Sequence, residues 1–278
     1  GEVLTSPAYN VSDADDVRVD GPISVKGWSP ENYSREYFGP VTLTRALAFS
    51  LNTVAVRLGL EVGPRTVVKT AHRLGILSDL EPNASIALGT SEVTPLEMVS
   101  AYAAFANGGI GVRPYAILSV RTAAGKRLLY RRHPYNYGRV IEPRYAAMMN
   151  AMMTETLTVG TAKKADLPGW QAAGKTGTSQ DFRDAWFVGY TSHLVAGVWL
   201  GNDDGTPTKK VSGGNLPVEV WSRFMRDAHA GVPPAPLPMD DGRGYEPPAP
   251  DAPPAMSVSA GQPMAINPSL RRGEVAPP

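Results

Sequence analysis

The chain of 278 residues carries 27 Lys and Arg against 26 Asp and Glu, and it contains no cysteine. Its formal net charge of +1 gives no electrostatic reason to expect a nucleic-acid partner, and the absence of cysteine excludes disulfides, thiol catalysis and zinc–thiolate sites. No apolar run is long enough to cross a bilayer, whereas the length allows a substantial buried core.

Residues 1–40 are polar and contain several prolines, so we expect an irregular segment that packs on the rest of the domain. Its aromatic side chains are the expected anchors: Trp28, Tyr33, Tyr37 and Phe38. The acidic run from Asp13 to Asp20 is typical of a solvated loop rather than of a metal site.

From Val41 the apolar residues recur at helical spacing in two stretches, which are separated by Ser50-Leu51-Asn52. Short polar side chains favour helix caps, so one interpretation is that Ser50 or Asn52 simply caps the second helix. The other is that this triplet contributes to a catalytic site.

A helix is predicted over 64–74 and ends at Gly75. Another lies within 86–109, where residues 94–97 (Thr-Pro-Leu-Glu) form a capping box with a favourable proline, and Gly108-Gly109 ends it. The order of the later elements is two strands within 114–130, a helix at 143–157, strands around Lys175, at 185–191 and at 194–200, and a helix at 217–230.

Three neighbouring strands joined by short turns predict an antiparallel meander. Beyond Gly231 the chain is dense in proline and poor in large apolar residues, which predicts a disordered tail. The sequence thus divides into the segment 1–40, a domain at 41–230 and a tail at 231–278.

Lys175-Thr176-Gly177-Thr178 places an ammonium, two hydroxyls and a bare backbone side by side on one predicted strand. Strand alternation sends Lys175 and Gly177 to one face and the two threonines to the other, unless the twist of an edge strand brings a threonine round to the ligand. Glycine in a strand often marks close approach of a ligand or another backbone. Such an edge is suited to binding an extended peptide that ends in a carboxylate.

The triplet at Ser50 and the Lys-Thr-Gly motif are two of the three motifs that characterise penicillin-binding proteins and serine β-lactamases. The chain resembles the transpeptidase domain of class A (bifunctional) penicillin-binding proteins. Five stretches carry the resemblance: 28–33 (WSPENY), 50–52 (SLN), 88–98 (LGTSEVTPLEM), 174–178 (GKTGT) and 184–191 (DAWFVGYT). It implies an α/β (α+β) fold in which an antiparallel sheet is sandwiched between helices.

The resemblance also implies the chemistry, which is acyl transfer without metal or cofactor. Ser50 would relay protons, Asn52 would bind the peptide amide, and Lys175 would supply a cation. Thr176, Gly177 and Thr178 would bind the substrate, with the carboxylate of the stem peptide or β-lactam held by the two threonines. The implied partners are peptidoglycan stem peptides and β-lactam antibiotics.

The family's third motif, Ser-x-x-Lys, carries the nucleophilic serine and occurs nowhere in this sequence. We therefore expect the nucleophile before Gly1, in the N-terminal part of a longer parent that is membrane-anchored at the periplasmic face of the bacterial inner membrane. The chain alone is then expected to be inactive. Two alternatives remain open: a D,D-carboxypeptidase or serine β-lactamase, and a non-enzymatic β-lactam sensor or pseudoenzyme.

Overall fold

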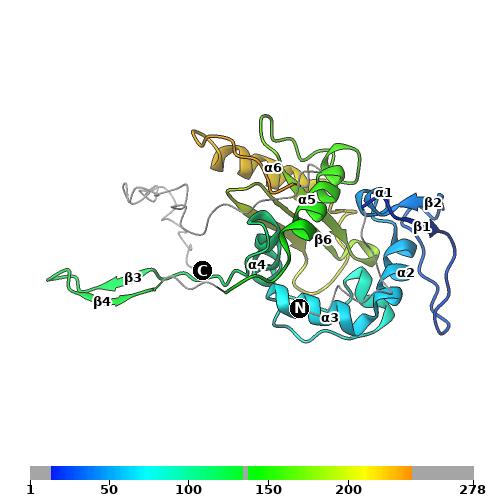
Figure 1. Ribbon diagram of the computed structural model, residues 1–278, viewed down its shortest axis with the longest axis horizontal. Helices are drawn as coiled ribbons and strands as arrows, with labels where there is room; N and C mark the ends of the chain where they lie inside the picture. Colours follow the sequence, from blue (N-terminus) through cyan, green and yellow to red (C-terminus); the bar gives the residue numbers. More distant parts are fainter. Residues whose placement is uncertain (1–13, 134–136, 240–278) are drawn as a thin grey trace, which may run out of the picture. The chain divides into compact units, whose positions relative to one another are not determined.

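The three-stranded antiparallel sheet of the computed structural model, which describes residues 14–133 and 137–239, forms the framework of the domain (Figure 1). Its strands are β5 (Ala173–Thr178), β6 (Asp184–Tyr190) and β7 (Val195–Gly201), in the spatial order of the chain. Lys175 pairs with Val188 and Gly177 with Trp186 across β5 and β6. The predicted meander is therefore confirmed.

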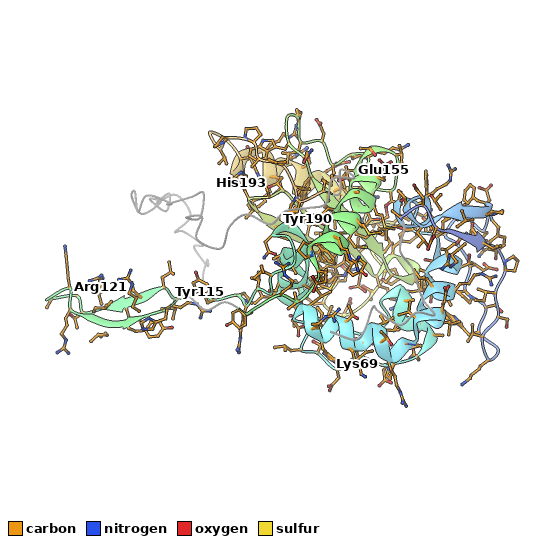
Figure 2. All side chains as sticks on the ribbon, in the orientation of Figure 1. Lys69, Tyr115, Arg121, Glu155, Tyr190 and His193 are labelled. Atoms are coloured by element: carbon orange, nitrogen blue, oxygen red, sulfur yellow. The ribbon has the colours of Figure 1, made fainter. Side chains whose placement is uncertain are left out.

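Helices cover both faces of this sheet. Phe187 and Tyr190 of β6 face opposite sides of the sheet. Phe187 packs edge-on against Trp221 of α6 (Leu216–Ala228). Tyr190, which is labelled in Figure 2, donates to the Asn150 Oδ1 atom of α5 (Pro143–Thr158) at 2.6 Å. Helix α4 (Pro95–Ala106) lies on the Tyr190 side, where Tyr102 contacts that ring. The expected sandwich of a sheet between helices is thus confirmed.

The remaining elements form a helical region beside β5 and a separate hairpin (Figure 1). Their bounds are β1 (Val17–Asp20), β2 (Gly39–Thr42), α1 (Leu43–Ala48), α2 (Asn52–Val62), α3 (Pro64–Leu74), η1 (Ala84–Leu88), β3 (Ser119–Arg121), β4 (Leu128–Arg131) and η2 (Gln180–Phe182). No helix in the described part of the chain combines the length and the apolar character needed to cross a bilayer.

Local signals placed several boundaries correctly. Helix α3 begins at Pro64 and ends at the left-handed Gly75, as predicted. Thr94 caps α4 through the Glu97 N–H while the Glu97 side chain accepts from Thr94 N, which is the predicted capping box. These contacts involve residues three apart in sequence, which explains why sequence reasoning found them.

The first segment differs from its prediction. It is not irregular throughout, because β1 pairs antiparallel with β2. Tyr33, Tyr37 and Phe38 are not buried anchors: Tyr33 is 79% exposed. Asp20, which we placed in a solvated loop, is instead 1% exposed. Hydrogen-bonded polar groups, rather than aromatic side chains, fix this segment.

The predicted tail also begins later than expected. Leu237 is 4% exposed and packs with Tyr190 and Met153, while the Pro238 carbonyl accepts from Asn150 Nδ2 at 2.6 Å. Residues 231–239 are therefore part of the fold, and the prediction of disorder is wrong there. The rest of the predicted tail, including the separate unit 247–278, lies outside the described residues.

Candidate active site

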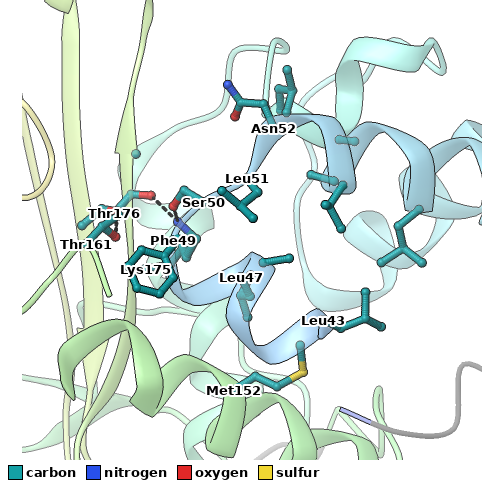
Figure 3. A pocket seen from close by; sticks show the side chains of 18 of the residues that line it. Leu43, Leu47, Phe49, Ser50, Leu51, Asn52, Met152, Thr161, Lys175 and Thr176 are labelled. Atoms are coloured by element: carbon teal, nitrogen blue, oxygen red, sulfur yellow. Dashed lines mark hydrogen bonds between the residues drawn. The ribbon is translucent and has the colours of Figure 1, made fainter. Parts of the chain in front are cut away.

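A cavity of about 2140 Å³ lies between β5 and the helical region. All six sequence-predicted site residues line it: Ser50, Asn52, Lys175, Thr176, Gly177 and Thr178. Figure 3 shows the Lys175 side chain reaching from β5 to Ser50, at the junction of α1 and α2. Two motifs that are 125 residues apart in sequence thus meet in one space.

The backbone at Ser50 is unusual for a serine. Its φ angle is 55°, in the left-handed region, and two hydrogen bonds close helix α1 around it: Leu51 N donates to Ala46 O at 2.9 Å, and Ser50 N donates to Leu47 O at 3.2 Å. This is the Schellman pattern, in which the left-handed position usually holds glycine. A serine there costs about 1 kcal/mol or more of backbone strain. Strained positions of this kind cluster at functional sites, which favours a functional role for the Ser50 hydroxyl.

Neither residue caps α2 with its side chain. The N-cap of α2 is Leu51, which makes no side-chain capping bond, so the interpretation of Ser50 or Asn52 as a simple cap is wrong. Asn52 instead donates from Nδ2 to the Glu31 carbonyl at 2.8 Å. This bond ties the amide to the segment before β2, while Asn52 still lines the cavity (Figure 3).

Lys175 Nζ donates to Ser50 Oγ and, at 3.0 Å, to the Thr176 carbonyl. Burial lowers the pKa of Lys175 to about 8, because the charged amine loses water. At neutral pH the amine is still predominantly charged, but it titrates within the physiological range. A cation of this kind can polarise the serine hydroxyl and bind an anionic ligand.

The two threonines of β5 line the same cavity as Lys175, and their hydroxyls bond to other partners than the amine. Thr176 Oγ1 bonds Thr161 Oγ1 at 2.6 Å, and Thr178 Oγ1 accepts from Gly213 N at 2.9 Å. Since the Thr178 hydroxyl is the acceptor in its bond, its own proton remains available for a ligand oxygen.

Sequence reasoning missed Thr161 and Gly213. A Cβ at Gly213 would lie 2.5 Å from the Gly177 carbonyl oxygen and 2.8 Å from Gly177 N, so only glycine allows the loop before α6 to pack against β5. The signal available in the sequence was the glycine pair Gly213-Gly214, which is typical of a turn but does not reveal its partner.

The far end of the cavity is apolar. It is lined by side chains from four helices: Leu43 and Leu47 of α1, Val54 and Leu58 of α2, Tyr102 and Phe105 of α4, and Met148, Met149 and Met152 of α5. Met153, by contrast, is a core residue. Small-molecule sites usually occupy about 300–1,000 Å³, so this space is large enough for a polypeptide segment as well as a ligand.

Comparison with known proteins agrees with this geometry. The family described as "Penicillin binding protein transpeptidase domain" matches residues 7–210, which is well over half of the chain. The chain belongs to this family. Penicillin-binding protein 1A of Neisseria lactamica is 38% identical over 237 residues, covering 80% of this chain and 30% of the relative. Penicillin-binding protein 1A of Aquifex aeolicus is 37% identical over 206 residues, covering 74% and 28%.

Solved structures of penicillin-binding proteins share the fold. Penicillin-binding protein 1A from Haemophilus influenzae superposes with a TM-score of 0.75 at 25% identity, over 81% of this chain and 40% of that one. The PonA1 protein from Mycobacterium tuberculosis in complex with penicillin V superposes with a TM-score of 0.72 at 29% identity, over 84% and 69%. The chain spans under a third of the length of the curated relatives above.

Proposed function

We propose that this chain forms the Ser-x-Asn and Lys-Thr-Gly walls of a D,D-transpeptidase site in a class A penicillin-binding protein. The parent would cross-link peptidoglycan stem peptides through an acyl-enzyme intermediate and would be acylated by β-lactams. The single observation that carries the proposal is the contact between Lys175 Nζ and Ser50 Oγ at the head of a peptide-sized cavity.

The reaction is acyl transfer in two steps. A serine oxygen bonds to the carbonyl carbon of the penultimate D-Ala, the C–N bond to the terminal D-Ala breaks, and the departing amine takes a proton. The amine of a second stem then attacks the ester, gives up its proton and releases the serine. Ser50 relays these protons, because Lys175 donates to its oxygen and leaves its hydroxyl hydrogen free to move.

Strand β5 holds the substrate. Among the described strands it pairs with β6 alone, and residues 175–178 line the cavity, where an extended peptide can add as a further strand. Thr178 donates its free hydroxyl hydrogen to the terminal carboxylate, and Thr176, hydrogen-bonded to Thr161, assists. The Thr178 backbone N–H serves as one oxyanion donor, a contribution typically worth about 3 kcal/mol.

Asn52 binds the peptide amide from the opposite wall. Its Nδ2 group donates one hydrogen to Glu31 O, which leaves the second hydrogen and the Oδ1 atom for the substrate. An amide offers both a donor and an acceptor, so it can pair with the N–H and C=O groups of an extended peptide. The site thus binds neutral peptide groups through Asn52 and anionic groups through the Lys-Thr-Gly strand.

The nucleophile is proposed to lie on a segment outside the given residues. The sequence contains no Ser-x-x-Lys, whereas the apolar end of the cavity offers the packing surface that a helix with one apolar face requires. Such a helix would bring its first turn to the head of the cavity, next to Ser50. The parent is proposed to be anchored at the periplasmic face of the inner membrane.

The test is acylation by a fluorescent penicillin, read by intact mass. The chain alone is expected to gain no adduct, whereas the chain extended through the Ser-x-x-Lys segment is expected to gain one β-lactam per molecule. Lys175→Ala in the extended protein should slow acylation by about 10²-fold or more, the typical cost of a lost electrostatic group in an active site. An adduct on the chain alone would contradict the assignment of the nucleophile.

Product analysis separates the remaining activities. Incubation of the extended protein with stem-peptide substrate should give cross-linked dimeric stems. Hydrolysed stems alone would indicate a carboxypeptidase, and rapid release of opened penicillin would indicate a β-lactamase. Acylation without any turnover of stem peptides would indicate a sensor.

A further inference from the structure

The most deeply buried carboxylate near the site belongs to Asp20, which is the last residue of β1 and 1% exposed. Neutral donors surround it: Asn32 Nδ2 donates to Oδ1 at 2.8 Å and to Oδ2 at 3.0 Å, Phe38 N donates to Oδ2 at 2.9 Å, and Thr53 Oγ1 donates to Oδ1 at 2.5 Å. No cation of the described residues lies within ion-pair distance of this carboxylate. Burying a charge without a counter-ion is costly, so these hydrogen bonds must be well made.

Two of these donors are neighbours of the site. Asn32 follows Glu31, whose carbonyl accepts from Asn52, and Thr53 follows Asn52 in the first turn of α2. Asp20 therefore connects the two chain segments whose hydrogen bond sets the position of the Asn52 amide.

Asp20 also determines which way the Asn32 amide points. The Asn32 Nδ2 hydrogens go to Asp20 and to the Glu36 carbonyl at 2.9 Å, so its Oδ1 atom is left to accept from Thr53 N at 3.4 Å. Thr53 N is one of the unpaired N–H groups at the start of α2, where Leu51 provides no cap. Asn32 thus caps α2 from a distant part of the chain.

We propose that Asp20 is a positioning residue for the Ser50–Asn52 wall, acting through Asn32 and Thr53. The carboxylate is the common acceptor that locks the Asn32 amide, the start of α2 and the Thr53 side chain in one arrangement. Ser50 lies two residues before α2 in a strained backbone conformation, and strain of this kind persists only where the surrounding structure holds it. The catalytic consequence rests on the proposed function, whereas the positioning does not.

Asp20→Asn preserves shape but replaces one acceptor oxygen with an NH₂ group, which must face one of the existing donors. Thr53→Val keeps the carboxylate and removes a single bond to it. Thr44→Val is the matched control: Thr44 also lies at the start of a helix and donates to a residue just before β1, Ala14 O at 2.9 Å, but it does not contact the Asp20 network.

The experiment measures penicillin acylation in the extended protein and separates the limiting rate constant from the apparent affinity. We expect Asp20→Asn to lower the limiting rate constant about tenfold or more, which corresponds to about 1.4 kcal/mol. Thr53→Val should lower this rate constant severalfold. Thr44→Val should change it less than about twofold. Melting temperatures identify any variant that fails to fold. If Asp20→Asn fails to fold, the comparison of Thr53→Val with Thr44→Val tests the proposal. Equal rates for Thr53→Val and Thr44→Val would overturn the proposal.

A readout on the chain itself keeps the two proposals distinguishable. In amide hydrogen exchange, Thr53 N–H should lose protection in Asp20→Asn and Thr53→Val but not in Thr44→Val. If the unsubstituted extended protein is not acylated while these exchange differences appear, the proposed function fails and the positioning role stands. Unchanged protection of Thr53 in both variants would refute the positioning role directly.

Discussion

The desolvated amine of Lys175 predicts a specific pH dependence of acylation. Burial lowers its pKa from 10.5 to about 8, and the amine acts in its charged form when it donates to Ser50 Oγ. The charged form therefore dominates below this pKa and is lost as pH rises through it. About nine-tenths of the molecules carry the charge at pH 7 and about one-tenth at pH 9, whereas an ordinary lysine would remain almost fully charged at both.

The acylation rate of the extended protein should accordingly fall about tenfold between about pH 7 and pH 9, with a midpoint near pH 8. Lys175→Arg supplies the matched control, because a guanidinium stays charged throughout this range. That variant should be acylated more slowly at every pH, since the planar guanidinium does not fit the space of the compact Lys175 ammonium. Its acylation rate should not decline between about pH 7 and pH 9.

The pKa can also be measured on the chain without the nucleophile. Limited acetylation at a series of pH values, followed by peptide mass spectrometry, reports the reactivity of each lysine, with the exposed Lys126 as an internal reference. Lys175 should reach half of its limiting reactivity near pH 8. A midpoint at or above about pH 10, or an acylation profile that Lys175→Arg leaves unaltered, would refute the reasoning.

Three further predictions concern stability and the shape of the site. Leu237→Ala should lower stability by about 2–5 kcal/mol, because it empties a buried position, whereas Leu77→Ala at an exposed position should change the melting temperature little. Hydrogen bonds from Thr94, Ser78 and Leu77 lower the pKa of Glu97 to about 2, so the stability that this carboxylate provides is present above about pH 4.5 and lost as pH falls toward 2. Glu97→Ala should lower the free energy of unfolding by about 1 kcal/mol at neutral pH, measured by thermal or urea unfolding. It should also make stability fall less steeply as pH drops from about 4.5 toward 2. Gly213→Ala should push β5 outward, since its Cβ would collide with the Gly177 backbone, and should slow acylation more than it lowers the melting temperature; an unchanged rate would contradict this.

Much of the secondary structure follows from short-range chemistry. The capping box at Thr94, the left-handed Gly75 and the alternation along β5 each depend on residues that are close in sequence. The Ser50–Asn52 and Lys175–Thr178 motifs predicted the residues of both walls of the cavity. Sequence spacing alone does not show that Ser50 and Lys175 are in contact.

Tertiary contacts decided the rest. Asp20 in an acidic run is indistinguishable from a solvated residue until Asn32, Phe38 and Thr53 supply its hydrogen bonds. Leu237 in a proline-rich stretch is a core residue because it packs with Tyr190 and Met153. Its own N–H donates to Gln171 Oε1, and the next carbonyl, that of Pro238, accepts from Asn150.

The sequence by itself determined the family, the order of the elements and the motif residues that line the cavity, because these depend on local periodicity and on motifs. Only the tertiary structure decided which polar groups are buried, how Ser50 adopts a backbone conformation that usually requires glycine, and how burial lowers the pKa of Lys175 to about 8. Burial and desolvation arise from residues distant in sequence, and each depends on the complete packing around the group.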